Sequence, residues 1–159
     1  MKHYLFIILL QVCCYSCAQQ KVSINQLIGT KWSVESPQNV QRTIVFSKEY
    51  NTEITQVSFS EFPEDQYTTS CRFEYYLSNK VPTSFNKKNG DENKGMYLVE
   101  RPYNNENNDV SRKMWYYTII SYTPEKMVLF EKALEPKEGH IIMGGPPKDI
   151  TLTLERIYE

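Results

Sequence analysis

Short segments in which apolar and polar residues alternate recur along most of the chain. A period of two places apolar side chains on one face of a β-strand and polar side chains on the other. Such segments occupy residues 30–35, 40–47, 53–59, 70–78, 95–100, 112–123, 127–132 and 150–158. Turn-rich stretches separate them, and almost none is long enough for the crossover helix of a parallel sheet. The pattern therefore predicts an all-β domain, an antiparallel barrel or sandwich of about eight to nine strands.

We favour a closed barrel over a sandwich, because closure removes the exposed edges that strands otherwise have to protect. At most one short helical turn is expected, ahead of the first strand. Ser23 is a suitable N-cap for it, and Gly29 is a suitable stop.

Length and charge limit the possible functions. A chain of 159 residues is long enough for one domain of ordinary size. It carries 18 Lys and Arg against 19 Asp and Glu, a net charge of -1, with no block of one sign. Nucleic-acid binding needs a concentrated basic face, so no nucleic-acid partner is expected.

The N-terminal segment has the composition of an export signal. A basic start at Lys2 and His3 precedes an apolar run over residues 4–12. The run is shorter than the roughly 20 apolar residues of a spanning helix, and this arrangement is typical of a secretory signal. We therefore expect an exported protein whose barrel domain spans residues 19–159.

Two processing sites are compatible with this signal. Small residues at Ser16 and Ala18 suit cleavage after Ala18, which would remove residues 1–18. Alternatively, Ser16 before Cys17 resembles a bacterial lipobox, so that residues 1–16 are removed and Cys17 is lipidated. We favour lipidation. The protein would then be periplasmic or an outer-membrane lipoprotein, and would reach the membrane only through its anchor.

The sequence predicts no catalysis, no metal and no cofactor. His140 is the one histidine of residues 19–159, and no nucleophile motif accompanies it. Residues 89–100 match a calcium loop poorly, because Lys94 stands where that loop needs Gly. Cys71 is the one cysteine of residues 19–159, which excludes an internal disulfide and a thiolate metal site. We expect Cys71 to be a buried, unreactive thiol.

Three further segments are candidates for binding. The polar tract 104–109 is expected to be a mobile loop, with a hydrogen-bonding rim or a carbohydrate contact as the alternative. The Gly-Gly-Pro-Pro tract 144–147 is expected to end a loop, with a partner motif as the alternative. Aromatic residues lie on both faces at 75–76 and 114–117. We expect a loop to cover the outer face there, and an exposed binding patch is the alternative.

Residues 27–32 (LIGTKW) place Gly29 three positions before Trp32, at the start of the first predicted strand. This segment resembles the start of lipocalin-like proteins, small exported barrels of Gram-negative bacteria. Lipocalins open their first strand with Gly-x-Trp, and here Gly29 and Trp32 form Gly-x-x-Trp. In that family a basic residue near the last strand stacks on the Trp, a role that Arg156 would fill by a cation–π contact within about 6 Å. The resemblance implies a barrel floor at Trp32 and Arg156, an interior for a small apolar ligand, and no catalysis.

Alternation also selects residues that would line the interior. For the strand at 112–123 both faces are apolar, and a shift of one residue would invert the choice. We choose Tyr116 as inward there, which leaves Trp115 and Tyr117 outward. Tyr75 and Tyr116 would be the polar handles for a ligand. The full set of ligand-binding candidates is Phe46, Phe73, Tyr75, Leu77, Met114, Tyr116 and Ile120.

The expected function is non-catalytic binding of a small apolar or amphipathic ligand inside the barrel, in the cell envelope. The alternative is a structural, protein-binding or glycan-binding module with a packed core and an exposed aromatic face. Interior volume separates the two, because a drug-sized ligand needs a cavity of roughly 300 Å³ or more.

Overall fold

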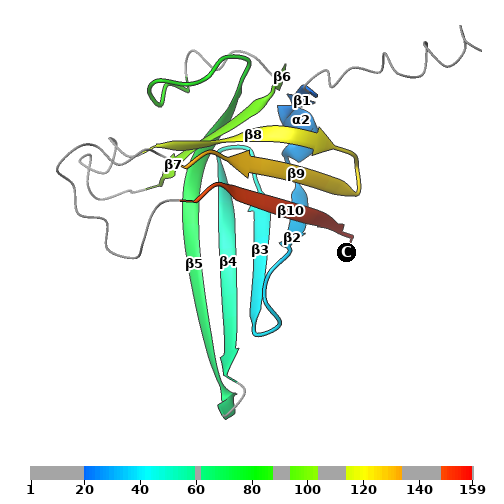
Figure 1. Ribbon diagram of the computed structural model, residues 1–159, viewed down its shortest axis with the longest axis vertical. Helices are drawn as coiled ribbons and strands as arrows, with labels where there is room; N and C mark the ends of the chain where they lie inside the picture. The colour runs from blue at the N-terminus through cyan, green and yellow to red at the C-terminus, as the bar shows by residue number, and fades with distance from the viewer. Residues whose placement is uncertain (1–19, 60–61, 88–93, 104–113, 134–147, 159) are drawn as a thin grey trace, which may run out of the picture.

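The computed structural model describes residues 20–59, 62–87, 94–103, 114–133 and 148–158. Eight strands form one closed antiparallel barrel in the order β10-β2-β3-β4-β5-β7-β8-β9 (Figure 1). The barrel strands are β2 (Thr30–Val34), β3 (Val40–Phe46), β4 (Tyr50–Phe59), β5 (Phe62–Ser78), β7 (Tyr97–Pro102), β8 (Trp115–Tyr122), β9 (Lys126–Glu131) and β10 (Ile150–Ile157). The all-β barrel predicted from the alternation is confirmed.

The alternating residues of these strands enclose a single apolar core. In β2, Thr30, Trp32 and Val34 are buried, and the residues between them are partly exposed. β2 pairs with β3 on one side and with β10 on the other, which closes the barrel between its first and last strands. Apart from the β2–β10 pair, each strand pairs with the next barrel strand along the chain. The barrel is therefore a simple meander.

A helical turn, α2 (Ile24–Leu27), fills one end of the barrel, which we call the plugged end. Its N-cap is Ser23, whose backbone N–H donates to Gln26 Oε1 at 2.8 Å. Gly29 follows the turn with φ of 77°, a left-handed conformation that favours glycine. Leu27 is fully buried within the barrel core. The helical turn predicted between Ser23 and Gly29 is therefore confirmed.

A second, two-stranded sheet holds the N-terminal segment against the barrel. β1 (Val22–Ser23) pairs antiparallel with β6 (Lys94–Gly95). β6 passes so close to β5 that a Cβ atom at Gly95 would lie 2.5 Å from the backbone nitrogen of Ser78. Only glycine fits at this crossing.

β4 and β5 run on beyond the barrel as a long hairpin, and we call this side the hairpin end (Figure 1). β5 contains 17 residues and begins well before the strand predicted at 70–78. Cys71 lies on this extension, opposite Glu53, and is exposed. The prediction of a buried thiol is wrong, because alternation assigns Cys71 to a face of the strand but cannot show where the core ends.

The outer face of the barrel carries a small covered aromatic cluster. Tyr76 points outward from β5, yet it is buried because the following loop folds over it. Its hydroxyl donates to the carbonyl oxygen of Ser84 at 3.2 Å, and its ring meets Phe85 edge-on at 5.2 Å. The loop cover expected at Tyr76 is therefore present.

Candidate functional site

The orientation of β8 decides which aromatic residues face the interior. Tyr117 pairs with the buried Leu98 and lines an interior pocket, and Ile119 is fully buried. Ile120 is 53% exposed, and Tyr116 packs against Tyr97. Trp115 and Tyr117 therefore point inward.

We predicted that Tyr116 and Ile120 face inward, and this prediction is wrong. The prediction that Trp115 and Tyr117 face outward is wrong as well. Both faces of β8 are apolar, so its composition does not indicate which face points to the interior. The pairing of β8 with β7 decides this. Met114 precedes β8 and lines a surface pocket of about 250 Å³ together with Pro82 and Tyr116. Met114 therefore does not line the interior pocket either.

The other candidates point inward as predicted. Phe46, Tyr75 and Leu77 are each 1% exposed and belong to the core. The rings of Phe46 and Tyr75 meet edge-on at 5.3 Å, and the Tyr75 hydroxyl donates to the carbonyl oxygen of Ser47 at 2.6 Å. Within this set only Phe73 lines the interior pocket. Their part in ligand binding stays a prediction.

The contact expected between Trp32 and Arg156 is present at the plugged end. The Arg156 guanidinium carbon lies 5.3 Å from the centre of the Trp32 ring. Trp32 Nε1 donates to Thr30 Oγ1 at 2.6 Å, and the Trp32 ring lies 6.1 Å from that of Tyr122. Side chains therefore fill this end of the barrel.

An interior pocket lies toward the hairpin end of the barrel. It has a volume of about 10 Å³, which is room for a group the size of one water molecule. A drug-sized ligand needs roughly 300 Å³ or more. The pocket is lined by Ile44, Asn51, Glu53, Phe73, Leu98, Glu100, Tyr117, Leu129 and Leu152.

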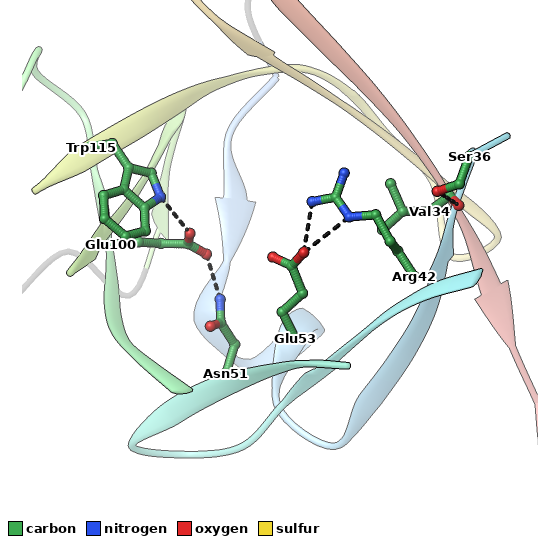
Figure 2. Close-up of polar contacts among 7 residues, drawn as sticks. All are labelled: Val34, Ser36, Arg42, Asn51, Glu53, Glu100 and Trp115. Carbon is green, nitrogen blue, oxygen red and sulfur yellow. Dashed lines mark hydrogen bonds and ion pairs between the residues drawn. The ribbon is translucent and has the colours of Figure 1, made fainter. Parts of the chain in front are cut away.

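A buried carboxyl group forms the polar side of this pocket. Glu100 on β7 is 6% exposed and Asn51 on β4 is 1% exposed. Asn51 Nδ2 donates to Glu100 Oε1, and Trp115 Nε1 donates to Glu100 Oε2 at 3.0 Å (Figure 2). Asn51 Oδ1 is buried and has no hydrogen-bond partner among the described residues. An unsatisfied buried acceptor costs about 1–3 kcal/mol, so it calls for an explanation.

Burial raises the pKa of Glu100 from 4.5 to about 7, because the ionised form loses its water. The hydrogen bonds from Asn51 and Trp115 oppose this pKa rise, and the charges of Glu53 and Glu131 add to it. Burial, followed by the charge of Glu100, also raises the pKa of Tyr117. Glu100 therefore titrates near neutral pH, while the Tyr117 phenol stays protonated.

An ion pair lies across the same interior from this cluster (Figure 2). Arg42 Nε and Nη2 both donate to Glu53 Oε1, at 2.9 and 2.8 Å. Both side chains are about one quarter exposed, at 29% and 26%. Arg42 neutralises Glu53, whereas Glu100 forms no ion pair within the part of the chain that is described. Glu100 is thus the carboxylate that lacks a compensating charge.

Our sequence reasoning did not select the polar residues of this site. One signal was present, because alternation over residues 95–100 places Glu100 on the same face as Leu98. Asn51 precedes the predicted strand 53–59, so nothing marked it as inward. Cys17, His140 and the segments 89–93, 104–109 and 144–147 lie outside the described residues.

The described residues hold no group of three or more His, Cys, Asp or Glu side chains that could bind a metal ion. None of their helices is long and apolar enough to span a membrane. No protein-family model matches the chain, and no curated protein matches it in sequence.

Proposed function

We propose that the protein binds a small amphipathic molecule at the hairpin end of the barrel, without catalysis. The observation that supports this is the buried Asn51–Glu100–Trp115 cluster beside an interior pocket. A carboxyl group and an unpaired amide oxygen are costly among apolar walls. Ligand sites combine such walls with a few polar groups that orient the ligand. The resemblance to lipocalin-like proteins is part of this proposal, supported by the closed barrel and by the Trp32–Arg156 contact.

The size of the pocket restricts what enters the barrel. A volume of about 10 Å³ admits a head group and no more. The rest of the ligand would lie along the inner face of the projecting hairpin. Val57 continues the face of β4 that carries Glu53, and Tyr67 pairs with Val57. Tyr67 is 62% exposed, and Phe59, next to the register shift near the tip of the hairpin, is 50% exposed, so the projecting hairpin offers apolar surface to an apolar chain.

A second candidate function is a protein-binding or glycan-binding module with a packed core. The small interior volume favours it, and the exposed Phe59 and Tyr67 would then contact the partner. Saturable binding of a small amphiphile separates the two functions.

Two neighbouring tyrosines of β8 give a matched test. 1-Aminoanthracene, an apolar fluorescent probe with one small terminal amino group, should bind the purified protein saturably. Tyr117→Phe should weaken binding severalfold, because it removes one hydrogen bond of about 0.5–1.5 kcal/mol from the pocket. Tyr116→Phe makes the same change on the outer face and should leave the affinity unchanged. Absence of saturable fluorescence, or equal affinities in both variants, would contradict the proposal and favour the packed-core module.

The proposal includes export and lipidation at Cys17. Gln20 Oε1 accepts a hydrogen bond from the Tyr122 backbone N–H at 2.9 Å, at the plugged end. Three residues of extended chain span about 10 Å, so a lipid on Cys17 would turn the plugged end toward the membrane and the hairpin end away from it. Cys17→Ala should abolish metabolic labelling with a fatty acid. An intact mass that corresponds to an unmodified chain from Gln19 would instead show simple secretion.

A further inference from the structure

The lining of the interior pocket includes a hydrogen-bond acceptor that no donor among the described residues satisfies. Asn51, Glu53 and Glu100 all line it, from two strands. The donors that reach these side chains are already engaged, since Asn51 Nδ2 and Trp115 Nε1 both donate to Glu100 and Arg42 donates to Glu53. The unpartnered group is an acceptor, Asn51 Oδ1, on a side chain that is 1% exposed. A ligand group that satisfies Asn51 Oδ1 must therefore donate a hydrogen bond.

The charges at the pocket favour a cation. Arg42 and Glu53 neutralise one another, and Glu100 has no cationic partner within the described residues. An anion would face the carboxyl group of Glu100, whose charge is not compensated, and would lose its water, which is unfavourable. Phe73 and Tyr117 supply aromatic walls, and aromatic ring faces attract cations.

The volume of the pocket selects among cationic groups. Room for one water-sized group, about 10 Å³, suits a primary ammonium, which carries three donors on one nitrogen. A quaternary ammonium is larger and has no donor for Asn51 Oδ1. A guanidinium is planar and needs more space than one water molecule occupies.

We propose that this pocket receives a primary ammonium group, with Asn51 and Glu100 as its main acceptors, so that the ligand is a primary alkylamine-type amphiphile. This inference rests on the proposed function and names the ligand class of the same site. The ligand's apolar chain would lie on the hairpin face that carries Val57 and Tyr67.

Four amphiphiles with the same octyl chain test the head group in isothermal titration calorimetry. At pH 8 octylammonium should bind the purified protein about tenfold more tightly than octanol or better, because hydrogen bonds to charged groups are the stronger ones. Octyltrimethylammonium should bind no better than octanol, because it neither fits nor donates. Octanoate should bind most weakly, because its carboxylate meets Glu100.

A matched pair of variants locates the effect. Glu100→Gln removes the charge with little change of shape, and should remove the preference for octylammonium over octanol. Glu155→Gln makes the same change at an exposed position on β10, and should preserve the preference. In the wild type the preference should also weaken as the pH falls from 8 to 5.5, because Glu100 takes up a proton below a pKa of about 7.

The outcomes separate the two proposals. Equal binding of all four amphiphiles would overturn the ammonium inference and leave amphiphile binding at the hairpin end intact, with water alone in the pocket. A preference for octylammonium that Glu100→Gln does not reduce would also overturn it, since the cation would then bind elsewhere. Binding of none of the four would overturn the inference and the proposed function together.

Discussion

Replacing Trp32 with alanine should lower the free energy of unfolding by about 3–5 kcal/mol, the range for truncating a large buried aromatic side chain. Trp32 is fully buried, contacts the ring of Tyr122 and lies beneath Arg156. The substitution would open a cavity beside the helical turn and leave the Thr30 hydroxyl without its donor. Urea denaturation followed by circular dichroism would measure the loss.

Two further variants serve as controls for the effect of Trp32→Ala. Arg156→Met keeps an unbranched apolar stem and removes the guanidinium charge, and should cost about 0.5–2 kcal/mol if the cation–π contact is what Arg156 contributes. Tyr67→Ala truncates an aromatic residue that is 62% exposed, and should change stability by less than about 0.5 kcal/mol. A loss below about 1 kcal/mol in Trp32→Ala would show that this end of the barrel is not part of the stabilising core.

Glu100 should make the wild-type protein less stable as the pH rises from about 4.5 through about 7. Its pKa is raised in the folded state, so the folded protein holds a proton that the unfolded chain has already released. The stabilising contribution is complete below pH 4.5 and is lost as the pH rises through about 7. A rise of this size corresponds to a free energy on the order of 3 kcal/mol.

Glu100→Gln should remove most of this pH dependence, because glutamine cannot titrate. Burial also raises the pKa of Glu131, so a smaller slope should remain in the variant. Urea denaturation of both proteins at intervals between pH 4 and pH 8 would measure the difference. Glu155→Gln should keep the wild-type slope. An unchanged slope in Glu100→Gln would mean that another group is responsible.

The strands themselves could be predicted because each needs one apolar face toward a shared core. β2 shows this directly, because Trp32 and Val34 are buried and the polar residues Lys31 and Ser33 are partly exposed. β8 could not be oriented, because Tyr116 and Tyr117 are equally suited to either face. The first part of β5 could not be found, because residues 66–69 lie beyond the core and nothing there selects apolar side chains.

The polar site was hidden for a different reason. A glutamate in a strand is normally a solvent-facing residue, so Glu100 gave no sign of burial by its type alone. Only its position on the same strand face as Leu98 indicated that Glu100 points inward. Its role in a polar site becomes apparent when β4 places Asn51 beside it. Asn51 lies on another strand, 49 residues away along the chain, and no local sequence pattern links two residues so far apart.

The pairing of β2 with β10 has a consequence for how the chain folds. Lys31 pairs with Ile157, so the barrel closes with residues near the two ends of the domain. Contacts between such distant residues carry a large loop-closure entropy and make folding slow. The other strands can assemble in order as they emerge, each onto the one before. Until Ile157 is free to pair with Lys31, β2 therefore keeps one edge unpaired.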